Sequence, residues 1–142
     1  TFFKQGVVKT DTVIYRTASP SERCTPNSNS SASFKLQSGD KIIPVESGKA
    51  ATVNVYVRTS VVGDSGGANY NGNAPRLILR QNYAAGITAD TVLGTLSGGS
   101  GSFALLTGTT VAVSANCTLH VYVDCDGTAG WINIDDWGFT TA

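Results

Sequence analysis

The sequence contains no methionine, one histidine and few charged or aromatic residues, and each shortage limits what the chain can do. Only 14% of its 142 residues are charged, and 10 basic side chains balance 10 acidic ones, so no net charge attracts nucleic acid or an anionic membrane. The apolar runs fall short of the roughly 18 residues needed to cross a bilayer. We therefore expect neither a nucleic-acid partner nor membrane insertion. Because methionine is absent, Thr1 is not a translation start, and we expect a processed chain or a piece of a larger protein.

The residues that are present favour an all-β domain. Short stretches rich in Val, Ile, Thr and Tyr alternate with Gly, Ser, Asn and Asp, and no helix-period segment exceeds about two turns. About ten short strands at this spacing predict an antiparallel, two-sheet jelly-roll β-sandwich over residues 7–142, after an N-terminal arm at 1–6. The predicted strands cover residues 7–17, 32–37, 41–45, 50–60, 75–81, 91–96, 102–108, 110–114, 117–125 and 130–139.

Alternation within the strands assigns side chains to opposite faces. The aliphatic positions are predicted to form the core: Val53, Val55, Val57, Leu77, Ile78, Leu79, Leu119, Val121, Val123, Ile132 and Ile134. The same alternation places Trp131, Trp137 and Phe139 on an outer face, where a terminal segment, a neighbouring subunit or a ligand must cover them. Other side chains predicted on outer faces are Tyr56, Arg58, His120 and Tyr122.

The segment "GDSGG" at 63–67 matches the sequence around the nucleophile of chymotrypsin-like serine proteases. A nucleophilic serine needs a base within hydrogen-bond reach and an acid that orients the base. The single histidine, His120, follows Ser65, whereas the protease order is His, Asp, Ser, and the chain is too short for two barrels. Because residues 63–75 are rich in Gly and Asn, we predict a long mobile loop there and a protein that is not an enzyme.

The acidic residues give no catalytic pair. Asp135 and Asp136 are adjacent, so on a regular strand they face opposite ways and do not flank one glycosidic bond. Asp124 and Asp126 precede a glycine turn and are predicted to be solvated turn acids. A structural calcium is the alternative for such acids, since Ca²⁺ takes six to eight oxygen ligands.

The three cysteines allow more than one pairing. Cys117 and Cys125 lie about 26 Å apart if their strand is continuous, which is beyond disulfide reach. Cys24 can pair with either, and an extracellular chain favours one bridge. Three cysteines without a close pair match no zinc spacing. Asn29 and Asn116 fit the N-glycan acceptor pattern.

Two segments together resemble a known family: "IIPVESGKAATVNVYVRTS", and later "FALLTGTTVAVSANCTLHVYVDCDGTAGWINIDDWGF". They are similar to the jelly-roll carbohydrate-binding modules of the galactose-binding-like superfamily, of the family 4, 9 and 22 type. The matching pieces are residues 45–58, 103–113 and 130–139, with Ile134-Asp135-Asp136-Trp137 at the closing motif. The resemblance implies a non-catalytic sandwich that binds glycans on a sheet face, with a structural calcium near Asp135 or Asp136 and no other cofactor.

Two functions follow from these observations. The first is a structural subunit, extracellular or on a virus particle, that assembles with copies of itself into a fibre or lattice. An arm carrying Phe2, Phe3, Val7 and Val8 would add a strand to a neighbour's sheet edge. The alternative is a glycan-binding module, in which Trp131, Trp137, Tyr56 and Tyr122 supply platforms and Arg58 and His120 supply polar contacts.

Overall fold

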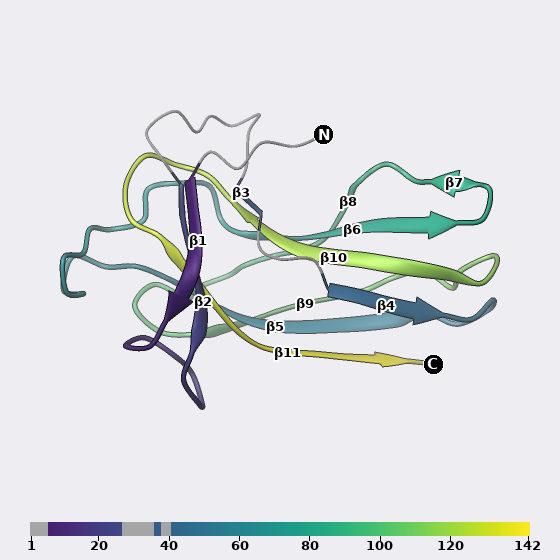
Figure 1. Ribbon diagram of the computed structural model, residues 1–142, viewed down its shortest axis with the longest axis horizontal. Coiled ribbons are helices and arrows are strands. Elements are labelled where there is room, and N and C mark those ends of the chain that lie inside the picture. The colour runs from purple at the N-terminus through teal and green to yellow at the C-terminus, as the bar shows by residue number, and fades with distance from the viewer. Residues whose placement is uncertain (1–5, 27–35, 38–40) are drawn as a thin grey trace.

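The computed structural model describes residues 6–26, 36–37 and 41–142, and within these ranges it consists of strands and turns (Figure 1). No helix in the described part of the chain has the length and apolar character of a membrane span. The strands are β1 (Gly6–Asp11), β2 (Ser21–Pro26), β3 (Leu36–Gln37), β4 (Lys41–Val45), β5 (Ala51–Thr59), β6 (Arg76–Tyr83), β7 (Gly86–Ile87), β8 (Thr91–Thr95), β9 (Ala104–Thr109), β10 (Cys117–Cys125) and β11 (Ile132–Thr141).

These strands form two antiparallel sheets, as the sequence predicted. Sheet A has the order β1-β2-β11-β5-β9, and sheet B has the order β3-β10-β6-β7, with β4 also paired to β10 and β8 to β6. In Figure 1, β6 and β10 of sheet B lie above β5, β9 and β11 of sheet A, and the β1–β2 hairpin crosses the view steeply. The chain is therefore an all-β sandwich with its core between the sheets.

The predicted core is confirmed with one exception. Alternate residues of β5 and β10 are fully enclosed, and Val55, Leu77 and Val121 are 0% exposed. Ile78, however, lies directly opposite Tyr122 of β10, on the outer face of sheet B. It is nevertheless only 4% exposed. The sequence placed Ile78 in the core because its neighbours are leucines, but strand alternation turns it away from them.

Several strand boundaries differ from the prediction. The first strand ends at Asp11 rather than at residue 17, because the Asp11 carboxylate accepts the N–H groups of Val13 (2.9 Å) and Ile14 (3.0 Å) and turns the chain. Residues 110–114 form no strand, and the N–H of Val113 instead donates to the carbonyl of Lys49. β2 and β7 were not predicted.

An irregularity in β11 changes the face of sheet A on which the side chains of its second half lie. The register of β11 against β5 shifts between Asp135 and Gly138, where Asp136 adopts a φ of 54°. The extra residue is a β-bulge, which reverses the alternation after it. Trp137 consequently packs against the core, and Phe139 falls opposite Val53 while remaining 49% exposed. The prediction that both share an outer face with Trp131 is wrong for this reason.

Along one side of the sandwich, two glycines allow strands of the two sheets to approach each other closely. β8 of sheet B approaches β9 of sheet A so closely that a Cβ at Gly108 would lie 2.5 Å from the carbonyl oxygen of Leu93. A Cβ at Gly94 would collide with the carbonyl of Thr107. On the other side, only residues 132–134 of β11 pair with β2, and the second half of β11 pairs with β5 alone.

Candidate functional site on the outer sheet faces

The loop that carries the protease-like motif is held by structural contacts. Arg58 of β5 donates two hydrogen bonds to Asp64, at 2.8 and 2.6 Å, and both side chains are 10% exposed. The hydrogen bonds from Arg58 hold the pKa of Asp64 below its usual value, although burial opposes them. Ser65 is exposed in this loop, whereas His120 lies on β10 of sheet B. The aspartate of the motif therefore stabilises a turn, and the buried guanidinium of Arg58 is paired with it.

The predicted long loop lies between β5 and β6, and it is fastened to the segment that follows β10. The Asp126 carboxylate accepts the backbone N–H of Asn73 (2.7 Å) and its side-chain amide (2.9 Å). The Oδ1 of Asn71 accepts the N–H groups of Thr128 and Ala129. Asp126 is only 3% exposed and so is not a solvated turn acid.

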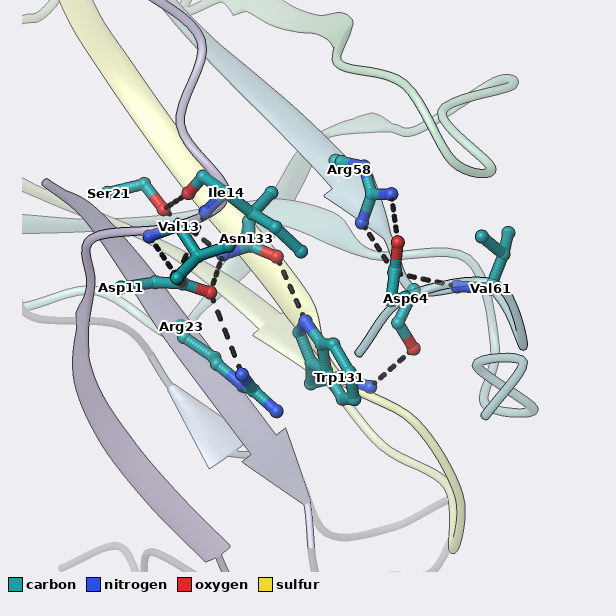
Figure 2. Close-up of polar contacts among 11 residues, drawn as sticks. Asp11, Val13, Ile14, Ser21, Arg23, Arg58, Val61, Asp64, Trp131 and Asn133 are labelled. Atoms are coloured by element: carbon teal, nitrogen blue, oxygen red, sulfur yellow. Dashed lines mark hydrogen bonds and ion pairs between the residues drawn. The ribbon is translucent and has the colours of Figure 1, made fainter. Parts of the chain in front are cut away.

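A buried polar network covers the outer face of sheet A beside the β1–β2 hairpin (Figure 2). Asn133 of β11 is 0% exposed. Its amide donates to the Asp11 carboxylate (3.0 Å) and to the Ser21 hydroxyl (3.1 Å). Its carbonyl oxygen accepts the indole N–H of Trp131 (3.0 Å). Burial raises the pKa of Asp11, but hydrogen bonds from Ile14, Asn133 and Val13 outweigh it and leave that pKa lowered.

Both aromatic rings predicted as platforms on this face are covered by arginines. The guanidinium of Arg23 lies 3.6 Å from a ring centroid of Trp131, which is 4% exposed. The guanidinium of Arg16 lies 3.5 Å from the ring centroid of Tyr56. A sugar ring stacks on an aromatic face only where that face is open. The outer face of sheet A therefore offers no open platform at Trp131 or Tyr56.

The two aspartates of the closing motif do not fit a calcium ion. Asp135 accepts the backbone N–H of Arg16 (2.8 Å) and that of Asp136 (2.9 Å). Asp136 accepts the Arg16 guanidinium (2.9 Å) and the Thr17 hydroxyl (2.9 and 3.0 Å), and the bond from Arg16 lowers its pKa. A Ca²⁺ site needs oxygen ligands, whereas hydrogen-bond donors and a positive charge face these carboxylates. Within the described residues, no three His, Cys, Asp or Glu side chains form a metal cluster.

The outer face of sheet B carries a polar cluster in which two side chains are accessible, while Tyr122 is only 5% exposed. Arg80 of β6 donates to both oxygens of Asp90, at 2.8 and 3.1 Å, and the Tyr122 hydroxyl of β10 donates to the same carboxylate at 2.6 Å. His120 lies directly opposite Arg80 in the β6–β10 pair. The side chains of Arg80 and Asp90 are 40% and 33% exposed. We call Arg80, Asp90, His120 and Tyr122 the sheet B cluster.

The contacts in this cluster set its charge state. Burial, followed by the hydrogen bond to Asp90, raises the pKa of Tyr122, so its hydroxyl stays protonated. Burial would raise the pKa of Asp90, but hydrogen bonds from Arg80 and Tyr122 outweigh it and hold the carboxylate ionised. Nearby, Arg76 pairs with Asp124 at 2.8 Å. Each cation among these pairs is balanced by a carboxylate, and Asp124, which was predicted to be a solvated turn acid, is 3% exposed.

The six predicted platform and contact residues are therefore not brought together. Trp131, Tyr56 and Arg58 lie on the outer face of sheet A, His120 and Tyr122 lie on the outer face of sheet B, and Trp137 turns to the core. Cys24 of β2 and Cys117 and Cys125 of β10 are buried as thiols, and a disulfide bond between Cys24 and either of the others stays a prediction. Val7 and Val8 belong to β1 and pair with β2 of the same chain, while Phe2 and Phe3 lie outside the described residues.

The structure describes one of the two predicted glycan acceptors. Asn29 lies outside the described residues. Asn116 is exposed, and its side-chain oxygen accepts the N–H of Ser47 at 2.8 Å. It also lines a pocket of about 560 Å³ together with Glu46 and Lys49. Glycosylation at either position stays a prediction.

No family model matches the sequence, and no curated protein matches it. Solved structures do share its fold. The chain aligns with a structure of the CBM22-1 and GH10 modules of Clostridium thermocellum endo-1,4-β-D-xylanase 10B in complex with xylohexaose. The TM-score is 0.68 at 13% identity, over 96% of this chain and 24% of that chain. It aligns with the CBM22-1 xylan-binding domain of Paenibacillus barcinonensis Xyn10C with a TM-score of 0.65 at 11% identity, over 99% of this chain and 84% of the domain.

A third similar structure is the enzymatically active domain of tailspike protein 4 from bacteriophage CBA120. Its TM-score is 0.67 at 12% identity, over 100% of this chain and 18% of the tailspike chain. The chain thus spans about a quarter of the xylanase structure and less than a fifth of the tailspike structure. These likenesses establish the fold alone, a jelly-roll sandwich that carbohydrate-binding modules also have, as the two resembling segments implied.

Proposed function

We propose that this chain is a non-catalytic carbohydrate-binding module that binds an uncharged glycan through the sheet B cluster. The observation that carries the proposal is the hydrogen-bonded set of Arg80, Asp90 and Tyr122, which the protein fixes while leaving Arg80 and Asp90 accessible. Its location on a sheet face is supported by the jelly-roll fold, which the chain shares with xylan-binding domains over nearly its whole length.

The chemistry of the cluster suits sugar hydroxyls. A carboxylate has about four acceptor sites, and three hydrogen bonds reach Asp90 from Arg80 and Tyr122, so acceptor capacity remains on its exposed side. Because the bidentate contact already orders Arg80, little side-chain entropy is lost when a ligand binds. His120 adds a planar, half-buried ring beside them. The balanced charges favour a neutral glycan over an acidic one, which would need an uncompensated cation.

The sequence alone ranked self-assembly ahead of glycan binding. The comparisons favour the reverse order, because the xylan-binding domains have this fold over nearly the whole of this chain. The ligand contacts that we propose also differ from the expected ones. Trp131 and Trp137 were expected to form the platform, but one ring is covered by Arg23 and the other packs against the core. We therefore assign the contacts to the polar groups of sheet B rather than to tryptophan stacking.

Isothermal titration calorimetry with xylohexaose and a panel of neutral oligosaccharides tests the proposal. Loss of a hydrogen bond to a charged group costs about 1.5–3 kcal/mol, so Arg80→Ala should weaken binding by about 10-fold to 100-fold. The matched control is Lys9→Ala, which removes an exposed cation from β1 of sheet A and should leave binding unchanged. Tryptophan emission should change little on binding. Absence of binding to every neutral glycan, or equal losses in both variants, would refute the proposal.

Self-assembly is the second candidate, and the outer edge of sheet A supports it. β1 is the terminal strand of that sheet, and its Val7 side chain is 57% exposed. An exposed strand edge is a site at which a second copy can add a strand. Light scattering separates the two candidates: an assembling subunit forms particles that Val7→Lys disperses, whereas a binding module is monomeric in both forms.

A further inference from the structure

We infer that the guanidinium of Arg16 takes the place of a divalent cation at the β11 bulge. It pairs with the Asp136 carboxylate, while the backbone N–H of the same residue binds Asp135. These contacts fasten the loop 12–20 onto sheet A, so the fold needs no calcium there. The family resemblance implied a structural calcium at this point, and the donors around Asp135 and Asp136 do not fit one. The inference concerns this chain's own residues and is independent of glycan binding.

The bulge brings both carboxylates to the same loop. Side chains of adjacent residues on a regular strand point to opposite faces, but Asp136 has a φ of 54° and the register shifts at this point. Both carboxylates consequently reach the loop between β1 and β2. Asp135 binds the backbone N–H of Arg16, and Asp136 binds the guanidinium of Arg16 and the hydroxyl of Thr17. Two adjacent negative charges are thereby bound to one residue, Asp136 by its positive side chain and Asp135 by its backbone N–H.

Arg16 also fixes the loop through its flat face. Its guanidinium lies 3.5 Å from the ring centroid of Tyr56, which is directly opposite Asp135 in the β5–β11 pair. A guanidinium can stack on an aromatic ring and donate in-plane hydrogen bonds to a carboxylate at the same time, whereas a lysine ammonium lacks that planar geometry. The ends of the loop are held separately, by Asp11 at Val13 and by the Ser21 hydroxyl at the carbonyl of Ile14.

A cation would be excluded while Arg16 is present and accommodated once it is removed. In Arg16→Ala, the carboxylate of Asp136 and the hydroxyl of Thr17 would face the space that the guanidinium leaves, while Asp135 would keep its two backbone N–H bonds. Carboxylate and hydroxyl oxygens are suitable ligands for Ca²⁺. The variant should therefore acquire the metal dependence that the native chain lacks, and Tyr56 should sensitise the luminescence of a bound Tb³⁺ ion.

The test measures melting temperature in EDTA and in excess CaCl₂, together with Tb³⁺ luminescence excited through tyrosine. The native chain should melt at the same temperature in both solutions and give no Tb³⁺ signal. Arg16→Ala should melt about 5 °C lower in EDTA, recover part of the loss in CaCl₂ and bind Tb³⁺.

The control is Arg80→Ala, which also removes the arginine from an accessible arginine–aspartate ion pair. The stability of this variant should not respond to calcium. Three results would each overturn the inference: a native chain destabilised by EDTA, an Arg16→Ala variant as stable as the native chain, or a variant whose stability ignores calcium. None of these results depends on glycan binding, so failure here and failure of the proposed function are distinguishable.

Discussion

Replacing Asn133 by alanine tests whether the buried network on sheet A stabilises the fold. The side chain is 0% exposed and makes three hydrogen bonds, to Asp11, Ser21 and Trp131 (Figure 2). The substitution removes all three and adds no new partner. The indole N–H of Trp131 then lacks its acceptor, and one carboxylate oxygen of Asp11 lacks its donor. Both groups lie in a region that water reaches poorly.

The expected cost follows from these losses. A buried polar group left without its partner costs about 1–3 kcal/mol, and loss of a hydrogen bond to a charged group costs about 1.5–3 kcal/mol. We therefore expect the free energy of unfolding to fall by about 3–5 kcal/mol, a large part of the roughly 5–15 kcal/mol that stabilises a typical domain. For a chain of this length, the melting temperature should fall by about 10–17 °C.

Urea unfolding followed by tryptophan fluorescence measures this loss. The matched control is Asn54→Ala on β5, because Asn54 is half-exposed and accepts one side-chain hydrogen bond, from Thr107 at 2.6 Å. It should cost no more than about 1 kcal/mol. Equal costs for Asn54→Ala and Asn133→Ala, or a cost below about 1 kcal/mol for Asn133→Ala, would refute the reasoning.

The same variant should change the pH dependence of stability. The folded-state pKa of Asp11 is lowered from 3.8 because the hydrogen bonds of its ionised form outweigh burial. A lowered folded pKa stabilises the protein above the unfolded pKa, and this stabilisation is lost as the pH falls through the folded value. Since Asn133 supplies one of those bonds, the stability difference between native chain and variant should be largest above about pH 4 and shrink in stronger acid.

Three further changes test other parts of the structure. Gly108→Ala places a Cβ against the β8 backbone and should cost about 1–3 kcal/mol, whereas Gly63→Ala enters open space and should cost little; equal unfolding midpoints in urea would contradict the close approach. Asp64→Ala leaves the buried Arg58 guanidinium without its carboxylate and should cost about 3–5 kcal/mol by the same assay, whereas a neutral result would mean that the pair contributes nothing. Thiol reagents without reductant should label all three cysteines in denaturant and the native chain only slowly, and fewer than three labels in denaturant would indicate a disulfide.

Alternation predicted the central strands well and the polar ones poorly. The bounds of β4 and β10 agree with the prediction to the residue, and in β10 alternating aliphatic and polar residues mark a strand that buries one face. β2 was missed because its sequence, SERCTP, contains Cys24 as its one strongly apolar residue. Val113 was predicted to lie in a strand, but it is a buried residue of a loop. Its backbone N–H donates to the carbonyl of Lys49. Local pattern thus identifies burial more reliably than it identifies strand pairing.

The candidate site depended on contacts that no local pattern reveals. His120 and Tyr122 were assigned to an outer face by alternation, and the structure agrees. Asp90 was not singled out, because an acid in a turn gives no sign of which cation it will meet. The reversal of Trp137 had one available signal: Gly138 interrupts an otherwise regular strand, and glycine inside a strand often marks a bulge.

The outer faces of the two sheets are covered differently, and this difference explains why the outer face of sheet B is the better candidate for binding. On sheet A, the hairpin and loop from β1 to β2 place Arg23 on Trp131 and Arg16 on Tyr56, so the outer face of each ring is already covered by a guanidinium. A ligand that stacked there would have to displace these contacts and leave carboxylates without their partners, which is costly where they are buried. On sheet B, Arg80 and Asp90 satisfy each other and still face solvent, so a neutral ligand can bind without breaking the pair. The difference between the faces therefore lies in what a ligand must displace.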